Sequence, residues 1–496
     1  MAFKFENSVF MSWKDKKEIF LLAGGLILLF LNLGQRPLWG AEGRWAEAVR
    51  EMLLRVDFWV PTLNGAPHLT KPLLPYWLLM LSAKIFGHLN EWTVRLPAAI
   101  SGILTLVFFY LLSRKFLEKG LALLATGLFL TSYGFFYYAR LTQSEIYQLL
   151  WVTAALAWYV HHREEKSFKG YLIFWLLVDL AALSKGLTGM AVPCLVVLMD
   201  WLVRKDTKHL NLKALLATLL GFALYFLHYY GIARASGSTL PFYLIIRENL
   251  LQAVSPYDHR EPFYVYLIYW PELLLPWTPF LFLALGWAFK NWQRLSPDTR
   301  WILAGNLAVF FLFTLARCRR FYYILPIFPL SILLISVCLQ SYYLRFKRFL
   351  WGAVWVFLAF EIIVFAILQP ILSSSSEKAF GESLSAFLRQ NPSLQVCVFK
   401  KASANLFFYL NLPRPVPVLR ELGEVKDCDL LFFRERYYQK EPLLRERAQD
   451  LWGVPEKLRS KDPNKNYLLW ILKEGNFSVP GLISIHEGTN NEKKSS

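Results

Sequence analysis

Long apolar runs recur along the whole chain, and they constrain its fold more than any other feature. Hydrophobic residues make up 55% and charged residues only 18% of the 496, which excludes an ordinary soluble enzyme and a disordered chain. Allowing for ragged ends, each run can cross about 30 Å of hydrocarbon. Because backbone polar groups in lipid must be satisfied within the segment, we expect eleven membrane-spanning helices rather than strands. The runs lie near 19–33, 94–113, 120–138, 145–160, 170–184, 187–203, 212–233, 263–289, 301–316, 322–340 and 349–371.

The basic residues of the short loops give the orientation. The first run follows Lys14, Lys16 and Lys17 and precedes no small-residue cleavage site, so we interpret it as an uncleaved signal anchor. With the N-terminus inside, 20 Lys and Arg fall on the cytoplasmic side, as the positive-inside rule requires. The net charge of +18 therefore comes from basic residues spread over the loops of a membrane protein. It does not indicate nucleic-acid binding. The cytoplasmic segments are 1–18, 114–119, 161–169, 204–213, 290–300 and 343–348.

An odd number of crossings places the tail, residues 373–496, on the outer side. Strand-like stretches near 395–399, 429–433 and 467–472 alternate with helix-like ones, which predicts a small α/β domain. We therefore divide the chain into a transmembrane catalytic domain, 1–372, and this C-terminal domain, and expect disorder from Glu487 on.

Cys397 and Cys428 both lie in the tail, where an oxidising compartment would permit a disulfide. We expect them to stay unpaired.

The first outer loop, residues 35–93, is the richest in polar and aromatic residues. Four apolar residues in it recur at helical spacing, namely Trp45, Val49, Met52 and Leu53. This stripe predicts an amphipathic helix lying in the membrane interface. The charged side chains of Glu47, Arg50 and Glu51 should point away from its apolar face.

Cations on the outer side break the topological rule, and they need a reason. One reason would be an anionic ligand held at the outer leaflet. A lipid phosphate suits Arg and Lys well. The alternative is that each cation snorkels to headgroups or pairs with Glu248, Glu261 or Glu272. For the cluster as a whole we favour the ligand. The residues are Arg44, Lys71, Arg140, Lys185, Arg247, Arg260, Arg317, Arg319 and Arg320.

Two outer carboxylates are candidates for a general base. Glu42 lies in the first outer loop and Glu145 starts the helix after the second; a partly desolvated carboxylate gains proton affinity. The alternative is that both are acids favoured by the dipole at a helix N-terminus.

Unusual charges lie at helix ends and no internal repeat is evident, which argues against a transporter. The outer histidines are a weak signal for a divalent metal; they are His68, His88 and His259.

Several motifs together resemble a known family. They are Trp39-Gly-Ala-Glu-Gly-Arg-Trp-Ala-Glu-Ala-Val-Arg-Glu-Met, Thr70-Lys-Pro-Leu-Leu-Pro-Tyr-Trp, Val94-Arg-Leu-Pro, Leu183-Ser-Lys-Gly, His259-Arg-Glu-Pro-Phe-Tyr-Val-Tyr, Leu275-Pro-Trp-Thr-Pro and Arg320-Phe-Tyr-Tyr-Ile-Leu-Pro. In this order they resemble the bacterial protein-mannosyltransferase and lipid A aminoarabinose transferase family. The resemblance implies a membrane all-α GT-C fold of about 11–13 transmembrane helices with interfacial periplasmic helices. It also implies a periplasmic active site and a polyprenyl-phosphate-linked sugar donor.

The resemblance also implies roles for particular residues. The family's acidic pair falls on Ala41-Glu42, so the leading Asp is replaced and Glu42 is the carboxylate left. Where the family commonly has Glu-Lys-Pro this chain has Thr70-Lys71-Pro72, which keeps the Lys of the phosphate site and loses a Glu associated with a metal. The family's Asp after the second outer loop is Glu145. His259 is the candidate ligand for a divalent metal ion, but the sequence does not require such an ion.

The function that we predict is an inverting transfer of a sugar from polyprenyl (undecaprenyl) phosphate, at the periplasmic side of a bacterial inner membrane. The acceptor is lipid A, lipopolysaccharide or another periplasmic molecule. Alternatives are a protein O-mannosyltransferase, an O-antigen ligase and a lipid-linked sugar transporter. Glu42 is the predicted base, with Glu145 next. The predicted donor-phosphate ligands are Arg44, Lys71, Lys185, Arg260 and Arg320, and the substrate-lining residues, unless they form an aromatic belt, are Trp45, Tyr76, Tyr322 and Tyr323.

Overall fold

The computed structural model describes residues 24–485 except 26, 259, 374, 449 and 474–477. The chain forms two compact units. The helical unit contains residues up to Leu33, Thr70–Leu78 and Arg95–Leu368, and the mixed unit contains Gly34–Leu69, Leu79–Val94 and the chain from Gln369 on. The start of the expected signal anchor and the tail from Glu487 lie outside the described residues.

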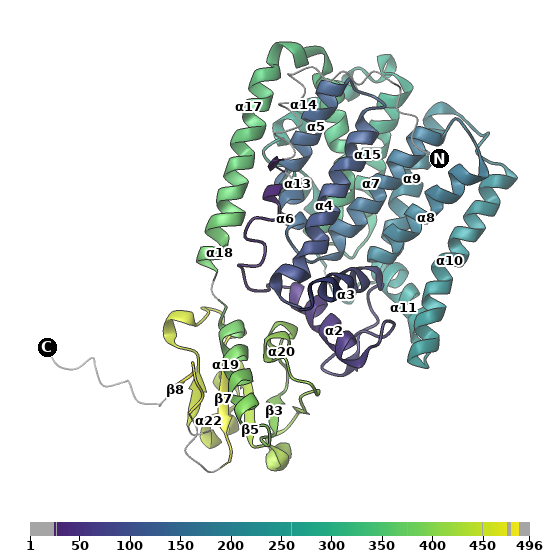
Figure 1. The fold of residues 1–496 in the computed structure, drawn as a ribbon. Helices are drawn as coiled ribbons and strands as arrows, with labels where there is room; N and C mark the ends of the chain where they lie inside the picture. Colours follow the sequence, from purple (N-terminus) through teal and green to yellow (C-terminus); the bar gives the residue numbers. More distant parts are fainter. Residues whose placement is uncertain are drawn as a thin grey trace. The chain divides into compact units, whose positions relative to one another are not determined.

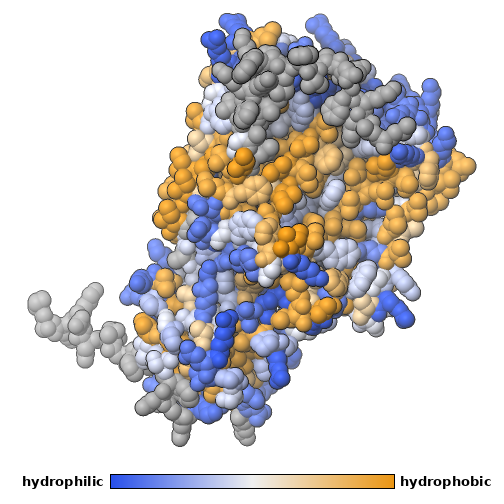
Figure 2. All heavy atoms as spheres, viewed as in Figure 1, coloured by the Kyte–Doolittle hydropathy of each residue, from blue (hydrophilic) through white to orange (hydrophobic). Residues whose placement is uncertain are grey.

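Apolar helices dominate the helical unit. Five helical segments of the described chain are long and apolar enough to cross a membrane, or up to seven if each bent helix pair counts as one span. Apolar side chains cover the flank of this helical bundle (Figure 2). The α-helices are α4 (Glu91–Ser113, which begins in the mixed unit), α5 (Lys119–Leu130), α6 (Tyr133–Ala139), α7 (Ser144–His162), α8 (Phe168–Lys185), α9 (Leu187–Arg204), α10 (Leu212–Ser236), α11 (Leu240–Ile245), α12 (Gln252–Val254), α13 (Val265–Leu273), α14 (Thr278–Lys290), α15 (Pro297–Leu315), α16 (Phe328–Leu339) and α17 (Tyr343–Glu361).

Short 3-10 and π segments connect several of these helices. They are η1 (Ile246–Leu251), η2 (Trp292–Arg294), η3 (Phe321–Ile327), η4 (Gln340–Tyr342) and η5 (Ile362–Leu368). Every expected run from 94 onward coincides with helical structure, which confirms helices rather than strands. In Figure 1 the neighbouring helices α7, α8, α9 and α10 run side by side.

Two of the eleven expected spans are not straight helices but pairs of helices that meet at a bend. The 120–138 run is bent by 68° between α5 and α6, and the 263–289 run by 116° between α13 and α14. Thr131 donates its hydroxyl to the Gly127 carbonyl (2.8 Å), and Pro276 in the second break has no N–H. The breaks meet, because the Tyr133 N–H donates to the Leu275 carbonyl oxygen (2.8 Å). Each break thus satisfies polar groups that the other leaves open.

The turn between α8 and α9 is a single residue, Gly186. Its φ of +97° is a conformation that side chains rarely permit, and a Cβ there would lie 2.6 Å from Asn249 Oδ1. Asn249 accepts the Leu187 N–H (2.8 Å), which caps the start of α9. The Ser-Lys-Gly sequence therefore fixes Lys185 at the end of α8.

Asp179 corrects the expectation that unusual charges lie only at helix ends. It lies within α8, is 5% exposed, and neither carboxylate oxygen has a hydrogen-bond partner in the described part of the chain. It is covered because α8 packs against α7, α9 and α10.

A six-stranded mixed sheet forms the centre of the mixed unit. Its strand order is β4-β3-β5-β7-β6-β8; β3 pairs in parallel with β4 and β5, and the other pairs are antiparallel. The three strands expected from the sequence are confirmed as β3, β5 and β7. The strands are β3 (Val396–Phe399), β4 (Val418–Leu419), β5 (Leu430–Arg434), β6 (Leu451–Gly453), β7 (Tyr467–Ile471) and β8 (Ile483–Ile485).

Alternating side chains give this sheet two apolar faces. Val398 and Phe432 pack with Phe380 of α19, whereas Phe399 and Leu431 pack with residues around α22. The other elements of the mixed unit are α2 (Glu42–Arg55), β1 (Thr62–Leu63), β2 (Ala66–Pro67), part of α3 (Leu74–Phe86), α18 (Gln369–Leu372), α19 (Ser376–Gln390), α20 (Ala404–Leu410), η6 (Leu422–Asp427), α21 (Glu435–Lys440), α22 (Pro442–Arg447) and η7 (Glu456–Leu458). The first loop therefore folds with the tail rather than with the apolar helices.

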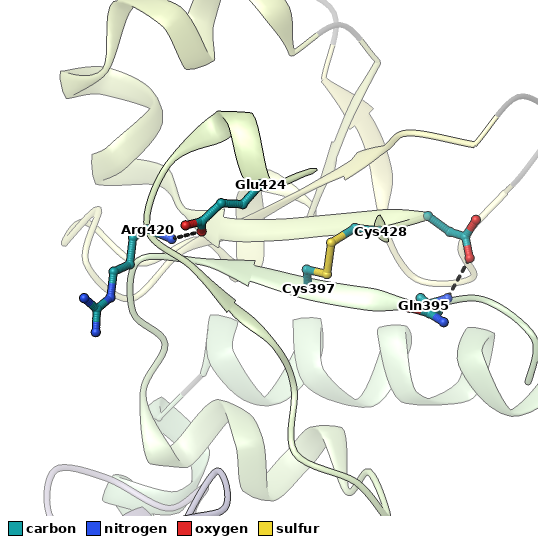
Figure 3. Close-up of a disulfide and its surroundings, with 6 residues drawn as sticks. Gln395, Cys397, Arg420, Glu424 and Cys428 are labelled. Atoms are coloured by element: carbon teal, nitrogen blue, oxygen red, sulfur yellow. Dashed lines mark hydrogen bonds between the residues drawn. A yellow bond between two sulfur atoms is a disulfide. The ribbon is translucent and has the colours of Figure 1, made fainter. Parts of the chain in front are cut away.

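Cys397 and Cys428 form a disulfide, so the expectation that they stay unpaired is wrong (Figure 3). Their Cα atoms lie 5.9 Å apart, within the range that a disulfide spans. The parallel pairing of β3 with β5 causes this proximity, since Cys397 lies opposite Leu431 and Cys428 precedes β5 by two residues. A hydrogen bond from the Gln395 N–H to the Asp429 carboxylate (2.7 Å) holds the same two chain segments together.

Candidate active site

The helical unit contains a buried ion pair between two of the predicted site residues. Glu145 lies in the first turn of α7 and Lys185 is the last residue of α8. The Lys185 Nζ lies 3.3 Å from Glu145 Oε1, and the two side chains are 9% and 6% exposed. We call Glu145, Lys185, Tyr322 and Tyr323 the Lys185 cluster.

The ammonium group of Lys185 is poorly satisfied within the protein. Its contact with Glu145 lacks hydrogen-bond geometry, and the described residues offer it no hydrogen bond. It lies 4.0 Å from the ring centroid of Tyr323 and 5.9 Å from that of Tyr322, where the negative faces of the rings attract a cation. A buried ammonium without hydrogen bonds is costly, so this is a place where an anionic oxygen would be stabilised.

Lys71 and the 317–320 segment contribute to the same electrostatic environment. Burial, and then the charge of Asp258, raises the pKa of the Cys318 thiol, while the positive charges of Lys71 and Lys185 lower it. Lys71 also acts electrostatically on Lys185 itself. The structure therefore brings Lys71, Lys185 and Cys318 into one neighbourhood, as the phosphate-site prediction requires of the two lysines.

Arg320 and Arg260 have other contacts. The Arg320 Nη1 lies 3.8 Å from Glu261 Oε1, and the pKa of Glu261 is raised by burial and lowered by Arg320. Tyr266 donates its hydroxyl to the Arg320 carbonyl (3.1 Å), which fixes the start of η3. Arg260 is exposed, and its Nε donates to the Pro256 carbonyl (2.8 Å). Arg320 thus faces Glu261 and lies shortly before Tyr322 in the sequence. Arg260 has no contact with the Lys185 cluster in the described residues.

Two other outer cations have structural contacts. Arg140 donates to the carbonyls of Leu29 (2.7 Å) and Leu31 (2.7 Å), at the end of the first apolar run. Arg319 donates to the carbonyls of Thr314 (2.9 Å) and Glu261 (2.9 Å). These two guanidinium groups satisfy backbone carbonyls, and they need no ligand to explain them.

Glu42, the predicted base, is fully buried in the mixed unit. Its Oε2 accepts from the Arg36 Nη2 (3.1 Å) and from the Trp39 N–H (3.1 Å). The N-cap residue of α2 is Ala41, which has no side-chain acceptor, and Glu42 in the first turn accepts from the Trp39 N–H just before the helix. Sequence reasoning did not find Arg36, although the Gln-Arg-Pro that ends the first run was a signal for it.

The remaining predicted residues of α2 are placed differently from one another. Arg44 is exposed, whereas Trp45 is 6% exposed and packs inside. Tyr76, on α3 in the helical unit, is 1% exposed. Trp45 and Tyr76 are therefore each covered by protein.

The acidic side chains that lie off the apolar stripe of α2 are buried. Glu47 is 1% exposed and pairs with Arg50 (2.7 Å); burial raises the pKa of Glu47 and Arg50 lowers it. Glu51 accepts from the Thr62 hydroxyl and from the Gly65 N–H (3.1 Å). The cause is α20, which covers α2: Arg50 donates to the Leu412 carbonyl (2.7 Å). Helix α2 is therefore internal to the mixed unit rather than a free amphipathic helix.

The predicted metal ligand His259 lies outside the described residues. Within the described ranges no group of three or more His, Cys, Asp or Glu side chains is arranged to hold a metal ion. We therefore derive no step of the chemistry through a metal.

Comparison with known proteins identifies the class. The family model described as dolichyl-phosphate-mannose-protein mannosyltransferase matches residues 70–230. ArnT from Cupriavidus metallidurans, in a crystal structure bound to undecaprenyl phosphate, aligns over 92% of this chain and 98% of its own, with a TM-score of 0.73 and 18% identity. The archaeal oligosaccharyltransferase AglB from Archaeoglobus fulgidus aligns over 96% of this chain and 76% of its own, with a TM-score of 0.58 and 12% identity. The protein has the GT-C fold, with a small C-terminal α/β domain.

Relatives in sequence show the same resemblance. An uncharacterized protein from Aquifex aeolicus is 31% identical over 339 residues, covering 66% of this chain and 65% of its own length. The undecaprenyl phosphate-alpha-4-amino-4-deoxy-L-arabinose arabinosyl transferase of Aeromonas hydrophila is 28% identical over 368 residues, covering 72% of this chain and 66% of its own length. The chain thus spans slightly less than two thirds of the length of these relatives. The resemblance to the protein-mannosyltransferase and lipid A aminoarabinose transferase family is confirmed.

Proposed function

We propose that this protein is an inverting glycosyltransferase that moves a sugar from polyprenyl (undecaprenyl) phosphate to lipid A, lipopolysaccharide or another acceptor. The activities for which its relatives are named and the shared GT-C fold support the donor class. We also propose that the reaction takes place on the periplasmic side of a bacterial inner membrane, because the loop charges favour that orientation. In this proposal residues 1–372 form the catalytic domain and 373–496 a periplasmic domain.

The buried ammonium of Lys185 is the observation that carries the proposal. It lacks hydrogen bonds in the described part of the chain and is held beside Glu145 and two tyrosine rings. A donor phosphate would supply the missing acceptors. Lys71 adds a second positive charge nearby, and the two lysines would stabilise the charge that grows on the leaving polyprenyl phosphate. Arg44, Arg260 and Arg320 remain proposed donor-phosphate ligands.

Inversion requires the acceptor to attack the anomeric carbon from the side opposite the phosphate. Glu42 is the proposed base for an acceptor hydroxyl. It is buried, and the Arg36 guanidinium and the Trp39 N–H donate to the carboxylate and orient it. An acceptor that is already a phosphate anion needs no strong base, and Glu42 would then orient it. This accommodates Ala41 in place of the family's leading acid.

A protein acceptor is the second candidate, because the matching family model is that of protein mannosyltransferases. The Lys185 cluster and Lys71 serve both candidates equally, since both use a polyprenyl-phosphate donor. The acceptor is therefore the part of the reaction to be assigned by assay.

The experiment uses membranes that contain the full-length protein, a panel of radiolabelled undecaprenyl-phosphate sugars, and lipid A and protein as acceptors. We expect label to move from one donor to one acceptor class, and to lipid A if the arabinosyl relatives are the better guide. Lys71→Ala should weaken the use of donor at least tenfold, whereas Arg345→Ala, a charge removed from an exposed site on α17, should not. Transfer from no lipid donor, or unchanged donor kinetics in Lys71→Ala, would overturn the proposal.

A further inference from the structure

A cavity of about 350 Å³ lies within the helical unit, between α7, α8, α9 and α10. This volume is in the range of small-molecule sites. Met190 and Trp201 both line it and lie eleven residues apart on α9, which is about 16 Å along the helix. The cavity is therefore long, and it suits an extended chain better than a compact ring. Its walls are largely apolar and include Phe174, Trp175, Cys194, Val197, Leu198 and Phe222.

Polar side chains gather at one end of this cavity. Lys166 and Ser167 line it where α7 connects to α8, and His209 lines it where α9 connects to α10. The His209 ring stacks on Trp201 with centroids 5.2 Å apart. The Lys166 Nζ pairs with Asp206 (2.9 Å) but stays partly exposed, with 22% of the side chain accessible. The cavity thus has an apolar body and one basic end.

Four further lysines surround the basic end without acidic partners. Each is exposed, and none forms an ion pair in the described part of the chain. They occupy the first turns of α8 and α10 and the connection between α9 and α10, next to the cavity lining. Arg163, by contrast, is occupied by Asp200 (3.2 Å) and Asp298 (2.8 Å). The exposed lysines are Lys169, Lys205, Lys208 and Lys213.

The cavity is separate from the Lys185 cluster. Ser167 is the N-cap of α8 and Lys185 is its last residue, so the basic end lies about 27 Å along the helix from the Lys185 ammonium. On the orientation proposed above, this end faces the cytoplasmic leaflet. The outer side of α10 is apolar and exposed at Leu215, Leu216 and Leu219, which places the cavity at the depth of the hydrocarbon.

We propose that this cavity binds one acyl chain of an anionic phospholipid, with the phosphate of that lipid at the Lys166 end. An apolar slot within membrane helices excludes a water-soluble ligand, and its length matches a hydrocarbon chain. The four exposed lysines outnumber the exposed acids of the same connections, Glu164 and Glu165, and this excess favours a negative headgroup, because each cation near the membrane surface attracts anionic lipid. The bound lipid would fill the space between α8, α9 and α10 at the end opposite the proposed reaction.

The first test is native mass spectrometry of the full-length protein in detergent, titrated with phosphatidylglycerol or phosphatidylcholine. We expect one phosphatidylglycerol to be retained at energies that strip the others, and phosphatidylcholine to be retained at least tenfold less. Thr218→Trp places a large ring in the cavity and should remove the retained lipid. The matched control is Leu219→Trp, the next residue on α10, which is 57% exposed and points outward. Equal retention of both lipids, or a retained lipid in Thr218→Trp, would overturn the proposal.

A second test uses the unmodified protein, so that it does not depend on how Thr218→Trp folds. Phosphatidylglycerol with a photoreactive group in its acyl chain should crosslink to Trp175, Cys194 or Phe222, which line the cavity. Excess phosphatidylglycerol should prevent this crosslink, and Lys166→Gln should weaken it several-fold. Crosslinks confined to the outer face of α10, or competition by undecaprenyl phosphate but not by phosphatidylglycerol, would overturn the assignment.

Discussion

Glu42 and Glu145 begin two different helices in the two units, and both are buried beside one cation. Glu42 is held by the Arg36 guanidinium and by the Trp39 N–H, with distances of 3.1 Å each. Glu145 accepts from the Ser144 hydroxyl (3.3 Å) and faces Lys185 at 3.3 Å. The first carboxylate is fixed by the backbone turn that starts its helix. The second is held by a flexible side chain.

Glu42 is therefore held in a fixed position, whereas the ion pair of Glu145 can exchange its partner. Rearranging Glu42 would expose a backbone donor and a buried guanidinium, both of which are costly to leave unsatisfied. Lys185 meets Glu145 in an ion pair (3.3 Å), so its move to a phosphate would exchange one anionic partner for another. We therefore assign the stable geometry to Glu42 and the ligand-dependent geometry to the Lys185 cluster. The following predictions test this contrast.

Lys185→Ala should have the largest effect on transfer, a loss of about 10³-fold in kcat/KM for the donor, as when a transition-state charge loses its stabilising group. Lys185→Arg should recover part of this loss because it keeps the charge. Initial rates with labelled donor in proteoliposomes measure both. Near-normal rates in Lys185→Ala would remove the ammonium from the phosphate site.

Glu42→Gln should lower kcat about 10²-fold while leaving the KM for the donor nearly unchanged. Gln keeps one oxygen for Arg36 and the Trp39 N–H but cannot act as a base. Thermal unfolding of the purified variant is the control for folding. Full activity would move the base elsewhere, and a collapse of the melting temperature would make Glu42 structural.

Gly43→Ala should weaken the contact between α2 and α20 and lower the melting temperature by several degrees. A Cβ at position 43 would lie 1.9 Å from Asn405 Oδ1 and 2.7 Å from the Asn405 Cα, so backbone must move. Gly423→Ala is the matched control, because a Cβ there meets nothing within 4 Å. If both variants melt like the parent protein, α20 does not hold the helix that carries Glu42.

Glu145→Gln should have the smallest effect. The KM for the donor should fall a few-fold, with little change in kcat. Removing the carboxylate charge leaves Lys185 without its counter-ion and favours the anionic phosphate. The comparison of KM and kcat in one preparation measures this. A loss of kcat as large as that of Glu42→Gln would instead make Glu145 the base.

Sequence patterns predicted those parts of the molecule that depend on local periodicity. The apolar runs predicted the helices, and the strand-like stretches 395–399, 429–433 and 467–472 predicted β3, β5 and β7. The breaks at Thr131 and Pro276 were missed because each is stabilised by the other, through a contact between residues distant in sequence. The Cys397–Cys428 disulfide was missed because it depends on which strands pair.

The candidate site shows the same division. The pair formed by Glu145 and Lys185 joins two residues that motifs had singled out separately. The burial of Glu47 did not follow from the sequence because its partner Arg50 donates to the Leu412 carbonyl just after α20, more than 350 residues further along the chain. A periodic stripe identifies the apolar face of a helix, but it does not tell whether another element covers the polar face.

The central claim is that the Lys185 ammonium receives the donor phosphate. A structure of the full-length protein with undecaprenyl phosphate bound tests it most directly. We predict a phosphate oxygen within hydrogen-bond distance of the Lys185 Nζ, with Glu145 further from that atom than the present 3.3 Å. A phosphate bound elsewhere, with the Lys185–Glu145 pair unchanged, would contradict the claim.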